Sequence, residues 1–441
     1  MKLFALAPSI IPQASGFSVT QLMSLGDRVL ERAKQLGIEC TRGSFGAGSD
    51  GFDLYSGATD AGADYRQHFV YRFSVPPDHF YPNSELQQHA DLIGTRDAIE
   101  VRLFDEMIAI ATVNLEVNLD LAVEQFGADR KEFDCFVVRW VTQLCLEALK
   151  AVGECVAYAK TQNPKTRPAI DLMSSNTLSE ARVAWVHKVF VPELAELSTF
   201  TDPASPARNL VSERSLVEFS PDSDYFGWGD SIKVIDEKND WRDGCVLSQY
   251  FYFALDRFNR ALPALTQQLR SGREGGSLAV VKSLGMRSLG INLRHRISEK
   301  DIQYADFFHG IAGECRIPVE GYDLRWRFND LRRNLASKLP ILQDVLTELH
   351  DQSQRRTNAT VESMLFFVSF LSLVSLFLSS HDYVAKPAKD KVLSWTVVES
   401  MLPGKLSDIL SLSVGVAFCG LLIFASLRFS LLQKIMQKIR R

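Results

Sequence analysis

Three aspartates that could bind a metal ion lie close together in the chain. Asp222, Asp224 and Asp230 fall within nine residues, and carboxylate oxygens are ligands that hard divalent cations prefer. The spacing is not that of an EF-hand loop, because no glutamate stands at the twelfth position. The segment therefore predicts either a cation site or, as the alternative, a turn with solvated acidic side chains.

Positive charge gathers in a second short segment further along the chain. Four basic side chains there could bind a phosphate-bearing group. They are Lys282, Arg287, Arg294 and Arg296. The alternative is a solvated helix face that pairs with nearby acids such as Glu299. If the segment does bind a ligand, we expect a small anionic messenger.

Motifs of known enzymes and cofactor sites are missing from the sequence. The chain has no GxSxG, HExxH or GxxxxGK[ST] motif, and its eight histidines are dispersed. Gly46–Gly51 matches GxGxxG by letter, but poor helix formers follow it, so we interpret it as a turn. Seven scattered cysteines without a CxxC pair indicate reduced thiols. We therefore expect that the protein is not an enzyme and binds no cofactor. The net charge of −4 does not favour a nucleic-acid partner.

Two apolar runs near the C-terminus dominate the organisation of the chain. Residues 364–380 and 409–427 contain no charged side chain, and each run is close to the roughly 20 residues that cross a bilayer as a helix. They predict two transmembrane helices. Basic residues precede the first run and follow the second, which predicts a multi-pass protein of the inner membrane with both termini in the cytoplasm.

The residues before the first run predict a mixed α/β domain. Segments rich in aromatic and β-branched residues, such as 64–75 and 98–119, alternate with helical segments such as 133–160 and 241–269. The expected fold class is thus an α/β cytoplasmic domain, a long stalk helix and two C-terminal transmembrane helices. The expected boundaries are 1–320 for the domain, 321–363 for the stalk, 364–380 and 409–427 for the spans, 381–408 for an extracytoplasmic loop and 428–441 for a basic tail.

Polar residues in and before the first run fall on one side of a helix. Asn358, Glu362, Ser369 and Ser372 lie within about 80° of one another at 100° per residue, and Ser379 lies just beyond. Such a stripe predicts the lining of a pore in an oligomer. The alternative is that the serine hydroxyls bond to carbonyl groups of their own helix or hold helices together.

This order of elements resembles the CorA family of divalent-cation channels, in outline over the whole chain and in detail over residues 322–441. The family's Gly-Met-Asn signature is absent, and its place reads Ser379-Ser-His-Asp-Tyr383. The resemblance implies a homo-oligomer in the lipid bilayer, a pentamer in that family, that passes cations such as Mg²⁺ and is gated by its cytoplasmic domain. Two alternatives stay open: an antiviral or stress effector opened by a nucleotide messenger, and a membrane-anchored soluble domain without a pore.

Overall fold

A computed structural model gives the fold of most of the chain N-terminal to residue 386. The described residues are 1–14, 19–43, 69–76, 91–95, 97–105, 107–127, 129–162, 180–202, 205, 208, 210, 224–227, 229–234, 241–271, 278–311 and 313–385. They form two compact units. The first contains Met1–Pro263 and Asn292–Leu339, and the second contains Ala264–Ile291 and the chain from Pro340 onward.

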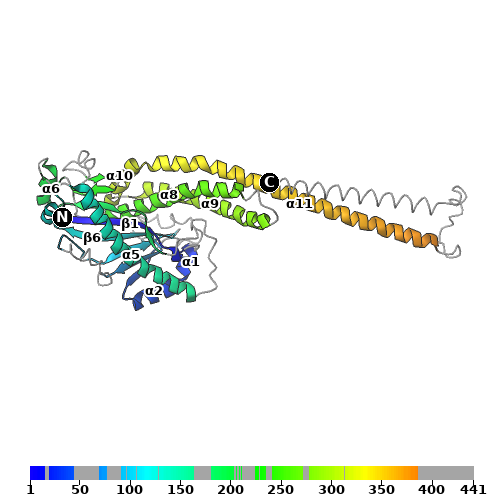
Figure 1. Cartoon of the computed structure of the whole chain (residues 1–441), viewed down its shortest axis with the longest axis horizontal. Coiled ribbons are helices and arrows are strands. Elements are labelled where there is room, and N and C mark those ends of the chain that lie inside the picture. Colours follow the sequence, from blue (N-terminus) through cyan, green and yellow to red (C-terminus); the bar gives the residue numbers. More distant parts are fainter. Residues whose placement is uncertain are drawn as a thin grey trace. The chain divides into compact units, whose positions relative to one another are not determined.

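The first unit is built on a mixed sheet with ten strands among the described residues. Strand β1 (Lys2–Ile10) lies in its interior, antiparallel to β6 (Ile108–Val117) on one side and to β8 (His187–Val191) on the other (Figure 1). The order is β2-β3-β5-β6-β1-β8-β10-β9, with β4 beside β6 and β7 beside β1. The remaining strands are β2 (Glu39–Arg42), β3 (Tyr71–Val75), β4 (Ile93–Gly94), β5 (Ile99–Leu103), β7 (Arg182–Val183), β9 (Tyr225–Phe226) and β10 (Asp230–Ile232).

Helices cover both faces of this sheet. Consecutive side chains of a strand point to opposite faces. In β8, Lys188 pairs with Asp134 of α5, whereas the adjacent His187 contacts Tyr322 of α10, so α5 and α10 lie on opposite faces. This double coverage explains why the central residues of β1 are buried along nearly the whole strand. The helices are η1 (Pro12–Ala14), α1 (Val19–Ser24), α2 (Gly26–Gln35), α4 (Leu119–Phe126), α5 (Arg130–Gln162), α6 (Leu194–Thr201), α8 (Trp241–Ser271), α9 (Leu278–Gly310), η6 (Gly313–Cys315), α10 (Arg316–Trp326) and α11 (Phe328–Ala385).

The predicted stalk is not one uninterrupted helix. Helix α10 ends at Trp326, Arg327 adopts a left-handed backbone with φ of 53°, and α11 begins at Phe328. Pro340 lies inside α11 without ending it. Helix α11 has 58 residues and contains the first apolar run as far as Ser380.

The prediction of membrane-spanning helices is wrong for the described chain. None of its helices combines the length and the apolar content needed to cross a membrane. The second run, 409–427, and the tail lie outside the described residues, as does the loop 381–408 beyond Ala385. The predicted fold class, with two C-terminal transmembrane helices, is therefore replaced by a large mixed sheet with helices. The finding on the described helices also does not fit the predicted multi-pass location in the inner membrane.

Candidate functional site

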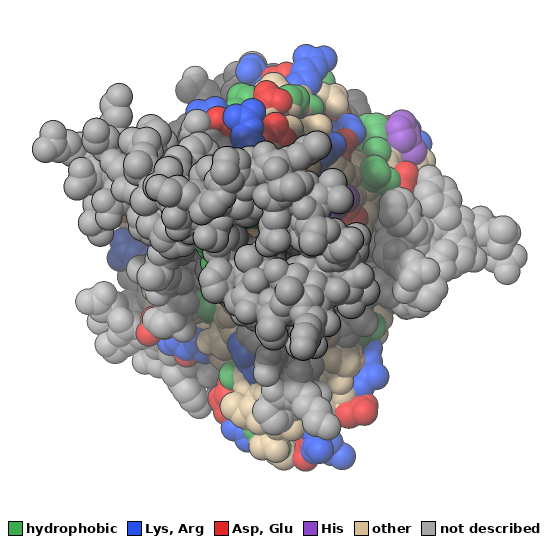
Figure 2. Space-filling view, turned by 90° about the vertical axis from the view of Figure 1, so that its right-hand side faces the viewer, with side chains coloured by type: hydrophobic (Ala, Val, Ile, Leu, Met, Phe, Trp, Pro, Cys, Tyr) green, Lys and Arg blue, Asp and Glu red, His purple; other side chains and the backbone are tan. Residues whose placement is uncertain are grey.

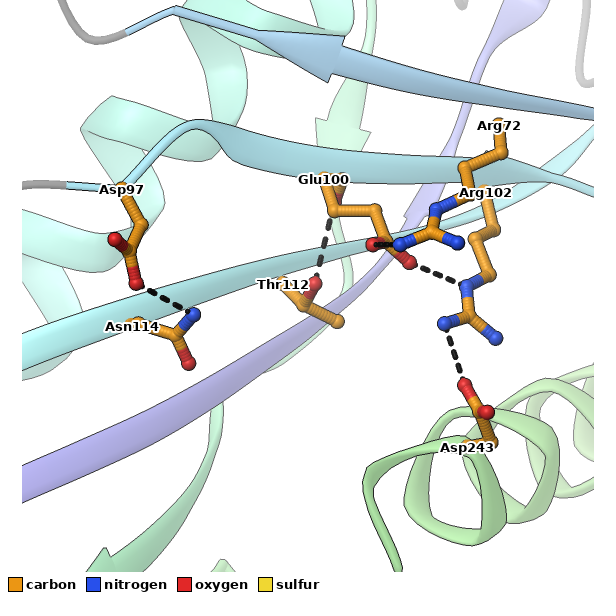
Figure 3. A network of polar contacts seen from close by, with 7 residues as sticks. All are labelled: Arg72, Asp97, Glu100, Arg102, Thr112, Asn114 and Asp243. Atoms are coloured by element: carbon orange, nitrogen blue, oxygen red, sulfur yellow. Dashed lines mark hydrogen bonds and ion pairs between the residues drawn. The ribbon is translucent and has the colours of Figure 1, made fainter. Parts of the chain in front are cut away.

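Charged side chains link the sheet to the start of α8 (Figure 3). Glu100 of β5 pairs with Arg72 of β3 and with Arg102 of its own strand, whose Nε lies 2.5 Å from Glu100 Oε1. Arg102 Nη2 also lies 2.5 Å from Asp243 Oδ1, in the first turn of α8. We call Arg72, Glu100, Arg102 and Asp243 the arginine cluster.

The strand register explains why the arginine cluster needs its carboxylates. Arg72 and Arg102 stand directly opposite each other in the β3–β5 pair, and like charges at such positions repel. Burial alone lowers the pKa of Arg102, but the Glu100 and Asp243 carboxylates outweigh this effect and raise the pKa above its ordinary value. Arg102 is therefore a permanent positive charge beneath α8, and it holds the first turn of that helix to the sheet.

A second set of contacts joins the end of β5 to α8 and α9. The Tyr250 hydroxyl donates to Asp105 Oδ1 at 2.5 Å, and Lys300 Nζ lies 2.5 Å from Asp105 Oδ2. Lys300 Nζ also donates to Gln303 Oε1 at 2.6 Å. Burial and the Asp105 charge raise the pKa of Tyr250 well above its usual value, so the phenol stays a donor. We call Asp105, Tyr250 and Lys300 the Asp105 cluster.

A third set lies between β8, β10, α8 and α10. His187 Nε2 lies 2.8 Å from the Tyr322 hydroxyl and 3.1 Å from Ser231 Oγ, and the Tyr322 hydroxyl lies 3.6 Å from Cys245 Sγ. Histidine, tyrosine and cysteine together can carry out nucleophilic chemistry. Burial raises the pKa of Cys245, however, which keeps it a thiol, and all of these side chains are buried. This His187 cluster therefore acts as a packing contact between helices and sheet.

The His187 cluster predicts a dependence of stability on pH. Burial lowers the pKa of His187 from 6.5 to about 4, and the Asp230 charge offsets this only in part. The folded protein then binds fewer protons than the unfolded chain below pH 6.5. Buried, neutral His187 therefore makes its full contribution to the free energy of unfolding above pH 6.5. This contribution, about 3 kcal/mol, is lost as the pH falls toward 4. Urea unfolding measured between pH 7 and pH 4 tests this. The free energy of unfolding of His187→Phe should fall less over this range than that of the wild type, and the same pH dependence in both would contradict the role of His187.

The aspartates predicted to bind a metal have lysine partners instead. Asp230 Oδ1 lies 2.9 Å from Lys188 Nζ, and Asp224 Oδ2 lies 2.7 Å from Lys233 Nζ. Asp222 lies outside the described residues. Among the residues that the structure describes, no group of three or more His, Cys, Asp or Glu side chains could hold a metal ion. Asp224 and Asp230 therefore serve as counter-charges for buried lysines.

Of the four predicted basic residues, the structure describes the side chains of Arg294 and Arg296, and these two do not lie together. Arg294 is exposed, whereas Arg296 is half-buried and lies near the charges of Asp105 and Glu299. Because they are two residues apart on a helix, at 100° per residue, their side chains point about 160° apart. Lys282 and Arg287 belong to α9, but their side chains lie outside the described residues. An anion site made of these four side chains stays a prediction.

The polar residues of the predicted stripe all lie in α11. Asn358, Glu362, Ser369 and Ser372 are exposed, and the side chain of Ser379 lies outside the described residues. The Ser372 hydroxyl donates to the carbonyl of Val368 at 2.9 Å, four residues earlier. The Ser372 hydroxyl thus bonds to a carbonyl group of its own helix, which is the alternative to pore lining given above.

Large apolar side chains are exposed along the same part of α11. We call residues 361–373 the α11 apolar segment. Its exposed members are Val361, Met364, Leu365, Phe366, Phe367, Val368, Leu371 and Leu373, with exposed fractions from 44% to 64%. On the described part of the face in Figure 2, by contrast, Lys and Arg side chains lie beside Asp and Glu side chains. A concentration of exposed apolar area of this kind marks an interaction surface.

The clusters between sheet and helices were not predicted from the sequence. One signal was available for the arginine cluster, because Glu100 and Arg102 alternate with apolar residues in a strand and so share a face. Their partner Asp243 is remote in sequence, and no local pattern identifies it.

Comparisons of the chain with protein-family models, curated proteins and solved structures found no match. The resemblance to the CorA family therefore stays a prediction.

Proposed function

We propose that the protein is a self-associating adaptor in which an α/β domain holds a long helix that joins several copies. The α11 apolar segment carries this proposal, because its large apolar side chains are exposed on every side of the helix. Met364 to Val368 are five consecutive exposed residues, and at 100° per residue they cover a full turn. A helix that is apolar all round is stable only when it is surrounded.

The shape of this surface favours copies of the same chain as partners. One neighbouring helix covers one side of α11 and leaves the rest exposed. Several copies of α11 packed as a symmetric bundle cover more sides of one another at the same level than a single neighbouring helix does, and closed symmetry is the rule among homo-oligomers. Residues 363–373 carry no charge, and the one charged side chain of the α11 apolar segment is Glu362 near its beginning, so identical segments do not repel along most of their length. Ser363 and Ser372 donate to carbonyls of their own helix, so these two hydroxyl groups keep a hydrogen-bond partner when helices pack closely.

The α/β domain holds the beginning of α11 firmly. The Phe328 ring stacks on Tyr304 of α9 at a centroid distance of 4.7 Å, and Arg332 Nε lies 2.5 Å from Asp301 Oδ1. The arginine cluster and the Asp105 cluster fix α8 and α9 to the same sheet. A ligand or a modification that changes the sheet would therefore act on the helix that joins the copies. Passage of cations, opening by an anionic messenger and a pentameric state stay predictions.

Co-purification of two differently tagged copies tests this proposal. We expect the wild-type copies to purify together. The triple variant Leu365→Gln, Val368→Gln and Leu371→Gln should lose the second copy, because it removes three exposed apolar side chains worth about 2 kcal/mol each when buried and keeps good helix formers.

The matched control is Asn358→Gln, an exposed polar position of the same helix. It should co-purify like the wild type. Retention of the second copy by the triple variant would overturn the proposal.

A further inference from the structure

Helix α8 contains a proline that removes one of its backbone hydrogen bonds. Pro263 lies eight residues before the end of the helix at Ser271. Proline has no N–H group, so the carbonyl four residues earlier loses its usual helical donor. That carbonyl belongs to Asn259. A backbone acceptor in a half-buried place needs another donor.

Lys338 of α11 supplies a donor at this place. Its Nζ lies 3.3 Å from the Asn259 carbonyl oxygen and 2.5 Å from Asn259 Oδ1. Both residues are half-buried, so water competes only in part for the contact. An ammonium group carries three donors, and it can therefore serve the backbone and the side chain of Asn259 together.

The contact occupies a defined place in the first compact unit. Pro263 is the last residue that α8 contributes to this unit, and Leu339 is the last that α11 contributes. Lys338 thus joins α8 and α11 close to the residues at which both helices leave the first unit. In α11 the next residue but one is Pro340, which removes a hydrogen bond from that helix as well.

We propose that Lys338 is a clasp that replaces the missing Pro263 amide and ties α8 to α11 at the turns weakened by proline. With the clasp closed, a displacement of α11 is passed to α8. The same helix carries Asp243 and Tyr250, which contact the sheet. The clasp is therefore a conformational device that links α11 to the sheet, and it does not depend on self-association.

Hydrogen exchange of full-length protein tests the clasp through a pair of substitutions. Lys338→Met keeps the length of the side chain and removes the donor, so we expect exchange of the α8 amides near Asn259 to become about tenfold faster. In the background Pro263→Ala, the restored amide at position 263 can donate to the Asn259 carbonyl. There the same lysine substitution should accelerate exchange much less, by about twofold.

Two further variants keep the test decisive. Arg333 also lies in α11, and its side chain is 83% exposed. Arg333→Met should therefore leave hydrogen exchange of the α8 amides unchanged. Asn259→Asp places a carboxylate next to the ammonium, and it should slow exchange even if Lys338→Met fails to fold. Equal acceleration by Lys338→Met with and without Pro263, or no effect of Asn259→Asp, would overturn the proposal.

Discussion

Replacing Asp105 with asparagine is expected to lower the free energy of unfolding by about 3 to 5 kcal/mol. Lys300 Nζ loses its carboxylate partner, and the Lys300 side chain is only 2% exposed. The asparagine keeps an oxygen that can accept the hydrogen bond from the Tyr250 hydroxyl, so the loss reflects mainly the unpaired buried charge. Urea unfolding followed by tryptophan fluorescence measures the change.

A double-mutant cycle separates the lost pairing from a general loss of packing. Lys300→Met should also destabilise the protein, because it leaves the Asp105 carboxylate buried without its ammonium. The double variant Asp105→Asn with Lys300→Met should recover a substantial part of the two losses, since neither charge remains. Strictly additive losses would show that the ion pair does not hold α9 to the sheet.

The second large effect is expected at Arg102. Replacing it with methionine keeps much of the apolar stem but leaves Asp243 without the guanidinium group that lies 2.5 Å away. Glu100 keeps Arg72 as a partner. We expect a loss of about 3 kcal/mol in the free energy of unfolding, and faster hydrogen exchange in the first turns of α8.

The matched control for Arg102 is an arginine in an exposed ion pair. Arg28 pairs with Glu31 on the surface of α2, with side chains 55% and 45% exposed. Arg28→Met should change the free energy of unfolding by less than about 1 kcal/mol. Similar losses for Arg28→Met and Arg102→Met would contradict the role that we assign to the arginine cluster.

Local sequence patterns predict much of the first unit. The predicted helices 133–160 and 241–269 lie within α5 and α8, and the strand-prone segment 98–119 contains β5 and β6. These elements bury regular patterns of apolar residues, which the sequence displays directly. The break at Arg327 lacks such a signal, because a left-handed backbone usually selects glycine or asparagine.

Candidate sites were predicted less well, because their partners are distant in sequence. Asp230 looked like a cation ligand until the parallel pairing of β10 with β8 placed Lys188 beside it. Arg294 and Arg296 looked like one basic group, but the helix turns them to different sides. The run 364–380 was interpreted as a membrane span from composition alone, whereas the described chain has no helix that meets the criteria of length and apolar content.

Sedimentation equilibrium of the full-length chain measures self-association in solution. We expect the wild type to have a mass that is a whole multiple, greater than one, of the mass of a single chain. We expect the single-chain mass for the triple variant Leu365→Gln, Val368→Gln and Leu371→Gln, with an unchanged far-ultraviolet circular dichroism spectrum. A single-chain mass for the wild type, or the same multiple for the triple variant, would contradict self-association through the α11 apolar segment.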